Sequence, residues 1–235
     1  MGKPPLKRRT VLRFAGDAKT IKGEPLGIET GICYLAPADS SGYEMCVRRT
    51  VGCTKFCLNK AGRGAFNSTQ VARIAKTKWF FEDRDGFMTQ ARRDIKSLRR
   101  RAKRNKRRPA VRFNGTSDRP DVAMQLAKEN PDLQFYDYTK IERPWLRRRA
   151  NYHITFSYSG ENFQDAMDCL KHGVNVSVVF MVKKGSPLPA MWNGYPVIDG
   201  DEHDARFLDP VGCVVGLRAK GPAKKAIASP FVVLS

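Results

Sequence analysis

The clearest hydrophobic pattern lies in the second half of the chain, where short apolar runs alternate with stretches of helical periodicity. The apolar, β-rich runs span residues 110–113, 133–136, 152–156, 174–182 and 213–217. The helical stretches between them span residues 121–129, 141–149 and 162–171. Such alternation is typical of βαβ units and predicts a parallel sheet. Residues 176–182 are almost uniformly apolar, which predicts a strand covered on both faces.

The first half of the chain predicts one more strand and two long helices. Residues 31–35 have the composition of a short strand. Residues 68–81 carry apolar positions at helical spacing, with Ser68 or Thr69 as the expected N-cap. A second helix is expected from about residue 86 to residue 106. Its apolar stripe recurs at i, i+4, i+7 and i+11 and consists of Ala91, Ile95, Leu98 and Ala102.

These elements predict an α/β fold, specifically an incomplete, open parallel barrel, because six or so strands are too few for a closed eight-stranded one. A chain of 235 residues fits one domain with a sizeable core. We expect residues 1–24 to form a basic arm and residues 25–235 a single domain, with a cysteine-bearing loop at 46–57. The sequence contains no apolar run long enough for a membrane span and no apolar stretch after its basic N-terminus, so neither a span nor a secretory signal is predicted.

Positive charge is concentrated in the second long helix. The chain has 43 Lys and Arg against 23 Asp and Glu, a net charge of +20, and eleven of the seventeen residues 92–108 are basic. Like charges at i, i+3 and i+4 repel by a few tenths of a kcal/mol each, so a bound polyanion would stabilise the helix. We predict that this external basic helix binds nucleic acid, DNA or RNA; a solvated charged face is the alternative. The predicted contacts are Arg92, Arg93, Lys96, Arg99, Arg100, Arg101, Lys103, Arg104, Lys106, Arg107 and Arg108.

Three cysteines follow the first predicted strand in the pattern Cys46-x6-Cys53-x3-Cys57. In a reducing cytoplasm, thiolates at such spacing favour a metal site over a disulfide framework. Structural zinc sites usually contain two closely spaced pairs of ligands, and only Cys53 and Cys57 approach that pattern. Cys33 is a conceivable fourth ligand, but it lies in an expected strand. Three close thiolates without a local fourth ligand suit an iron–sulfur cluster with one open iron at least as well as they suit zinc.

Small and polar residues follow the predicted strands. In parallel α/β folds the ligand site lies at the carboxyl ends of the strands, so we expect these residues to line one rim. Ordinary turns and helix caps are the alternative interpretation. The candidate catalytic residues at this rim are Asp118, Lys140, Glu161, Asp201, Asp204 and Arg206. A magnesium-dependent nuclease that uses the carboxylates of residues 199–204 is a weaker hypothesis.

Several motifs resemble a known family. They are Leu35-Ala36-Pro37-Ala38, the three cysteines, Gly62-Arg63-Gly64, Lys76-Thr77 and Val111-Arg112-Phe113-Asn114-Gly115-Thr116-Ser117-Asp118. Between about residues 25 and 221 the chain thereby resembles the gene-product-eighty-eight-like group of small phage-encoded proteins. The resemblance implies a protein of the infected host's cytoplasm, a barrel related to radical S-adenosylmethionine enzymes, and a four-iron, four-sulfur (4Fe-4S) cluster held by Cys46, Cys53 and Cys57.

The cysteine spacing departs from that of the radical enzymes, which typically have C-x3-C-x2-C where this chain has C-x6-C-x3-C. Binding of S-adenosylmethionine at an open iron therefore does not follow from the resemblance. Three hypotheses remain. The first is an iron–sulfur protein that binds nucleic acid, with or without a redox or processing activity. The second is a radical S-adenosylmethionine-type enzyme that acts on nucleic acid, and the third is a zinc-stabilised nucleic-acid-binding protein.

Overall fold

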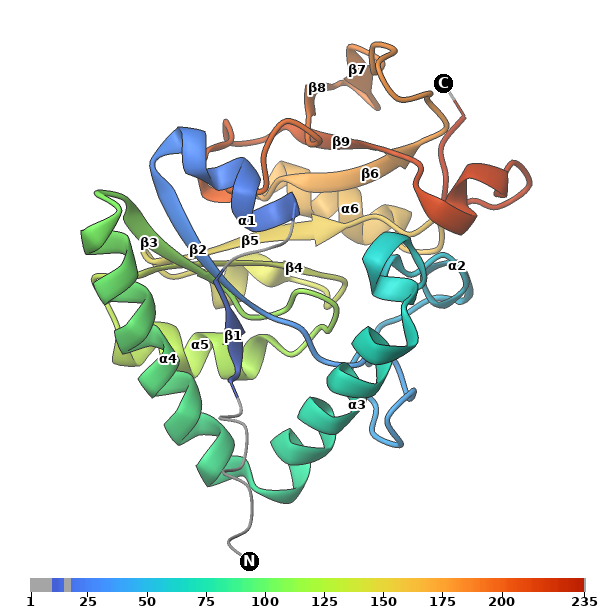
Figure 1. The fold of residues 1–235 in the computed structure, drawn as a ribbon. Coiled ribbons are helices and arrows are strands. Elements are labelled where there is room, and N and C mark those ends of the chain that lie inside the picture. Colours follow the sequence, from blue (N-terminus) through green and yellow to red (C-terminus); the bar gives the residue numbers. More distant parts are fainter. Residues whose placement is uncertain (1–9, 15–17, 235) are drawn as a thin grey trace, which may run out of the picture.

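A sheet of nine strands organises the protein, and the computed structural model describes residues 10–14 and 18–234 (Figure 1). The strand order is β1-β2-β3-β4-β5-β6-β9-β8-β7, and the neighbours from β2 to β8 are parallel, while β1 and β7 pair antiparallel at the two edges. The strands are β1 (Leu12–Arg13), β2 (Ile28–Cys33), β3 (Arg108–Arg112), β4 (Gln134–Thr139), β5 (Tyr152–Ser157), β6 (Val176–Phe180), β7 (Met191–Trp192), β8 (Tyr195–Asp199) and β9 (Val214–Arg218). The fold is therefore mixed α/β, as predicted, with a mostly parallel sheet that is not closed.

The helices are α1 (Ala18–Gly23), α2 (Val51–Lys55), α3 (Asn67–Glu82), α4 (Arg84–Arg104), α5 (Pro120–Glu129) and α6 (Phe163–Lys171). Helices α4, α5 and α6 cover one face of the sheet, and α1 lies on the opposite face, against Ile28 and Thr30 of β2 (Figure 1). The apolar sides of α4 and α5 pack on β2 to β5, and α6 packs on β5, β6 and β9. Side chains alternate between the faces of a strand, so the opposite face carries the polar positions, among them Arg112, Tyr138 and His153. No helix in the described part of the chain is long and apolar enough to cross a membrane.

Residues 1–24, expected as an arm, contribute β1 and α1 where the structure describes them. Val11 and Leu12 are buried, and β1 pairs with β2. The backbone N–H groups of both residues donate to Asp94 Oδ2 of α4, at 2.6 and 2.9 Å. A buried carboxylate inside the basic helix thus ties β1 to the sheet. Residues 1–9, which hold the first basic cluster, lie outside the described residues.

Most of the predicted elements are confirmed, with shifts at their ends. The six predicted strands correspond to β2, β3, β4, β5, β6 and β9, and the expected helices at 68–81 and 86–106 are α3 and α4. Helix α3 begins at Asn67, and its N-cap, Phe66, makes no side-chain capping bond, so the expected Ser68 or Thr69 cap is wrong.

The helix predicted at 141–149 is also wrong. Only a 3₁₀ turn, Pro144–Arg147, forms there. Arg143 before it adopts a left-handed conformation with φ of 51°, and the ring of Pro144 removes a backbone donor, so a regular helix cannot start upstream of the proline. The strands and α-helices missed by the sequence are β1, β7, β8, α1 and α2, each of them six residues or shorter.

The packing of α4 on the sheet gives the first testable prediction. Leu98 is fully buried against β2, so Leu98→Ala should lower the free energy of unfolding by about 2–5 kcal/mol. Lys96→Ala, an exposed position on the same helix, should change it by no more than about 0.5 kcal/mol. Urea denaturation of both variants measures the difference. Equal losses would show that α4 does not pack on the sheet by this stripe.

Candidate functional site

The carboxyl ends of β2, β3 and β4 bring three loops together. The cysteine loop follows β2, the loop from Asn114 to Asp118 follows β3, and Lys140 directly follows β4. Thr116 Oγ1 donates to Leu35 O at 2.6 Å, and Asp118 N donates to Met45 O at 3.0 Å. The β3 loop is therefore bonded along the cysteine loop, and the parallel sheet places both beside the end of β4.

Lys140 faces all three cysteines of the loop. Its ammonium group interacts electrostatically with Cys46, Cys53 and Cys57 and donates a hydrogen bond to Cys53. Asp118 also interacts with this ammonium group, and its carboxylate accepts from the Lys140 backbone N–H at 2.7 Å and from the Thr139 hydroxyl at 2.7 Å. We call Cys46, Cys53, Cys57 and Lys140 the thiol site.

The ionisation of these groups follows from burial and from their proximity. Burial raises the pKa of Cys46 to about 12 and also raises the pKa of Cys57. Burial works against the charge on Lys140, but Cys53, Asp118 and Cys46 together outweigh it and raise the pKa of the ammonium group. At neutral pH Cys46 is therefore a thiol, unlike a catalytic cysteine, whose pKa is lowered. A bound metal would deprotonate such a thiol.

Local hydrogen bonds hold the cysteine loop in this arrangement. Ala38 N donates to Cys46 Sγ at 3.5 Å, and the Thr50 hydroxyl caps α2 by accepting from Cys53 N at 3.1 Å. Arg49 bridges the loop, with contacts to Glu44 at 2.9 Å and Asp39 at 3.1 Å. N–H groups directed at sulfur are among the features that tune iron–sulfur sites.

As they stand, no three His, Cys, Asp or Glu side chains in the described ranges form a group that could hold a metal ion. The donor chemistry of the thiol site nevertheless fits a soft-ligand centre, because three thiols from one loop all interact with Lys140. Cys33 does not join them: it is fully buried in the core between the sheet and the helices. A fourth ligand from β2 would require the strand to leave the sheet.

A buried carboxylate that the sequence did not single out supports the β3 loop. Asp137 of β4 is 1% exposed and accepts from Asn114 N at 2.6 Å, from Asn114 Nδ2 at 3.0 Å and from Tyr152 OH at 3.2 Å. Burial raises its pKa to about 7. The side chain lies under α5, on the helical face of the sheet, and only its contacts across three strands reveal its role. It positions the loop that ends in Asp118.

The predicted rim residues near the C-terminus lie in a different part of the molecule. Asp201 follows β8 and pairs with Arg218 at 3.3 Å and with Lys220 at 2.5 Å. The chain then returns across the polar face of the sheet, where Asp204 pairs with Arg112 at 2.8 Å. Glu161 is exposed on the loop before α6. Among the candidate catalytic residues, the structure brings Asp118 and Lys140 to the cysteines and leaves the other four apart from them.

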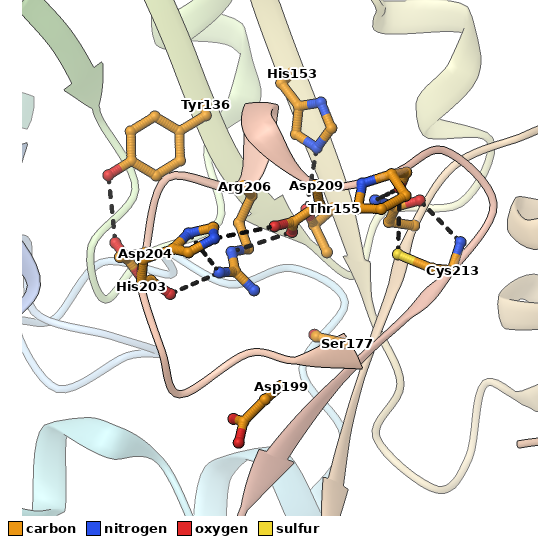
Figure 2. Close-up of polar contacts among 12 residues, drawn as sticks. Tyr136, His153, Thr155, Ser177, Asp199, His203, Asp204, Arg206, Asp209 and Cys213 are labelled. Atoms are coloured by element: carbon orange, nitrogen blue, oxygen red, sulfur yellow. Dashed lines mark hydrogen bonds and ion pairs between the residues drawn. The ribbon is translucent and has the colours of Figure 1, made fainter. Parts of the chain in front are cut away.

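Arg206 is held by polar contacts inside the molecule (Figure 2). It is fully buried, its Nη2 donates to His203 O at 2.6 Å, and its Nε lies 3.3 Å from Asp209 Oδ2. With the Arg112–Asp204 pair, this gives two arginines balanced by two carboxylates. Burying ions in matched pairs avoids the cost of an uncompensated charge. The network fastens the segment 200–209 to the sheet.

The predicted basic helix forms as the external helix α4, but it ends at Arg104, so Lys106, Arg107 and Arg108 lie beyond it. The cations of this segment divide into two groups. Four of them are half-buried and form ion pairs: Arg92 with Glu129, Arg99 with Asp132, Arg101 with Glu29, and Arg107 with Glu24 and Glu29. The other seven are exposed and form no ion pair within the described residues: Arg93, Lys96, Arg100, Lys103, Arg104, Lys106 and Arg108. Paired arginines anchor the helix, whereas exposed ones remain accessible to a partner.

The end of the basic segment and the thiol site lie at opposite ends of the parallel strands. Arg108 N donates to Gly27 O at 2.8 Å, which places the end of the basic segment beside the start of β2. The cysteine loop instead follows the end of β2. In Figure 1, α4 and α2 accordingly lie on opposite sides of the molecule. The two features that are close in sequence are therefore not neighbours in space.

Fold and site together define an α/β protein with an open, mostly parallel sheet and a thiol-bearing loop at the carboxyl ends of its strands. The model of the family described as Gene product 88 matches residues 7–233, so the chain belongs to that family. The family name supports the expectation of a phage protein. The match also confirms the resemblance to the gene-product-eighty-eight-like group that the motifs indicated. No curated protein and no solved structure matches the chain.

The raised pKa of Asp137 predicts a pH dependence of stability. The folded state binds this proton up to about pH 7, whereas an unfolded chain releases it near pH 4. The stabilisation from this proton is therefore complete at low pH and lost as the pH rises from about 4 to 7, by about 1.4 kcal/mol per unit. Asp137→Asn mimics the protonated carboxyl, so its stability relative to the natural chain should increase between pH 5 and pH 7.

Urea denaturation across this range provides the test, with Asp132→Asn as the control. Asp132 is exposed, and the hydrogen bond from Arg99 lowers the pKa of its carboxyl, so its titration lies below pH 5. Asp132→Asn should leave the change of unfolding free energy with pH as it is in the natural chain. If the unfolding free energy of Asp137→Asn changes with pH as steeply as that of the natural chain, Asp137 does not hold a proton in the folded state.

Proposed function

We propose that the protein is an iron–sulfur protein that binds nucleic acid through α4. Cys46, Cys53 and Cys57 would hold the cluster, of the 4Fe-4S type. The observation that supports this most directly is that the three thiols of one loop each interact electrostatically with the ammonium group of Lys140. Thiolates are the soft ligands that such clusters use, and a nearby cation offsets part of their negative charge. A bound cluster supplies electron transfer and binding energy that stabilises the loop.

Zinc at the same thiols would make the protein a nucleic-acid-binding protein with a structural metal. Zinc sites of that kind are closed by four protein ligands. The thiol site offers three cysteines, and the three histidines of the chain, His153, His172 and His203, are not among the groups that interact with them. This difference in ligand number favours the cluster over zinc.

A radical S-adenosylmethionine-type enzyme acting on nucleic acid is the second candidate, and one observation favours it. The open parallel sheet carries its cysteine loop after β2, the first parallel strand, at the carboxyl edge, the arrangement expected of an incomplete barrel of that class. The spacing C-x6-C-x3-C, however, departs from the C-x3-C-x2-C that is typical of that class. We therefore rank the enzyme second.

Removing a single proposed ligand tests the cluster. Cys53→Ala should lose most of its iron during anaerobic purification and should unfold at a lower denaturant concentration, because cluster binding is part of the folding energy. Cys169→Ala is the matched control, since Cys169 belongs to α6 and is fully buried in a different core cluster. Iron and sulfide are measured per chain in both variants. Iron retained by Cys53→Ala would count against the assignment.

The nucleic-acid contact is best supported on one side of α4. Arg93, Lys96, Arg100, Lys103 and Arg104 are exposed and follow one another at helical spacing, so they form a basic stripe about 17 Å long on the face away from the sheet. An anion along this basic stripe would relieve repulsion between like charges and release counterions. The four ion-paired arginines are excluded from the proposed contact, because binding there would have to break their pairs.

Charge reversal along the basic stripe tests this contact. The variant Arg93→Glu, Lys96→Glu, Arg100→Glu should bind labelled DNA and RNA at least about tenfold more weakly. The slope of its log affinity against log salt concentration should be shallower by roughly two to three. A triple variant with the same change in charge, Lys128→Glu, Lys183→Glu, Lys184→Glu, alters exposed residues elsewhere. Equal losses of affinity in the two triple variants would show that only the net charge matters. An unchanged affinity in the α4 variant would show that α4 does not contact the nucleic acid.

A further inference from the structure

An open groove of about 730 Å³ lies on the outer side of the cysteine loop. One wall comes from the end of α2, between Cys53 and Cys57, and the other from the C-terminal segment that begins with the 3₁₀ turn Gly221–Lys225. Its lining includes Lys55, Phe56, Pro222, Lys225, Ala226 and Ser229. In Figure 1 this C-terminal segment, in red, lies beside α2.

Close packing fixes the two walls relative to each other. The rings of Phe56 and Phe231 are 5.6 Å apart, and a Cβ added at Gly52 would lie only 2.9 Å from Phe231 Cβ. At the other end, Gly221 has φ of 54°, and a Cβ there would lie 2.8 Å from Ala61 Cβ. Glycine is thus required at both positions for the segments to approach. The groove is a built feature of the fold, with no need for the walls to move together on binding.

The groove combines positive charge with an apolar floor. Lys55 stands on one wall and Lys225 on the other, both are exposed, and no Asp or Glu is among the described residues that line the groove. Phe56 and Ala226 are buried beneath, while Pro222 is exposed at the side. The Ser229 hydroxyl accepts from Phe231 N at 3.4 Å.

We propose that this groove binds a nucleotide unit, with its phosphate between Lys55 and Lys225 and its base on the apolar floor. Two ammonium groups on facing walls suit a phosphate, and apolar surface between them suits the flat face of a base. The volume lies within the range of small-molecule sites, about 300–1,000 Å³. The unit comes either from a free nucleotide or from a single strand. The groove is separate from the basic stripe. It shares Lys55 and Phe56 with the cysteine loop, but no cysteine is among its lining residues, so the proposal requires no cluster.

Protection of lysine amines from acetylation, read by mass spectrometry, tests the site on the full chain. Adenosine monophosphate and oligodeoxythymidylate are the two probes. At least one of them should reduce modification of Lys55 and Lys225 several-fold and leave the exposed Lys184 unchanged. Protection by the monophosphate identifies a nucleotide site, and protection by the oligonucleotide alone identifies a strand-binding one. No protection by either probe would overturn the proposal.

Two further ligands separate phosphate recognition from weaker explanations. S-adenosylmethionine has the nucleoside without a phosphate, and polyglutamate has negative charge without a base. Equal protection by either would refute a nucleotide site in the groove.

Variants separate this site from the proposed nucleic-acid function. Lys55→Glu, Lys225→Glu should weaken binding of the protecting probe by about tenfold or more, because both charged hydrogen bonds to the phosphate are lost and two negative charges replace them. Lys183→Glu, Lys184→Glu changes the charge equally and should have little effect. The α4 triple variant should keep the protection of Lys55 and Lys225. If Lys55 and Lys225 lose their protection in the α4 triple variant, the groove does not bind the probe by itself. If α4 does not bind nucleic acid, the predicted protection of the two lysines stays the same.

Discussion

The charge of Lys140 is the constraint on which the carboxyl edge of the sheet depends. Three partly buried thiols and the buried carboxyl of Asp118 converge on this one ammonium group. A cation in a partly desolvated place is stable only when anionic or hydrogen-bonding partners surround it. Lys140 therefore favours the thiolate form of its neighbours, while burial favours the thiol. The proposed metal centre would resolve this conflict, because a metal binds thiolates and displaces their protons.

The arrangement of the sheet separates two roles. The thiol site lies where the parallel strands end, and the basic segment of α4 reaches the edge where they begin. A nucleic acid on the basic stripe would thus lie on the outer surface of the molecule, behind α4. The groove between α2 and the C-terminal segment gives the thiol-bearing edge a positively charged surface of its own. Contacts with phosphate at both edges would allow one partner to reach around the molecule.

The sequence predicts the parts of the fold that local patterning determines. The apolar run of β6 and the stripe of α4 were found because burial on both faces of a strand, or on one side of a helix, leaves a periodic signal. Strand β8 was missed because it is short, contains Pro196 and is largely half-exposed, so no alternation is visible. The arm was expected from composition, and its contribution to the sheet depends on Asp94, more than eighty residues away.

The site was predictable only in part for the same reason. The cysteine spacing and the polar strand ends identified Cys46, Cys53, Cys57, Asp118 and Lys140 as candidates. That Lys140 faces the thiols depends on how the β2 and β4 loops meet, which no local pattern encodes. Likewise, eleven basic residues appeared to form one surface. Pairing with Glu24, Glu29, Glu129 and Asp132, which lie in other elements, withdraws four of them from it.

Quantification of iron and acid-labile sulfide in the natural chain, purified without oxygen, tests the central claim most directly. The account predicts a brown protein with iron and sulfide in equal amounts, about four of each per chain for a 4Fe-4S cluster. A colourless protein that contains zinc, or neither zinc nor iron, would contradict it.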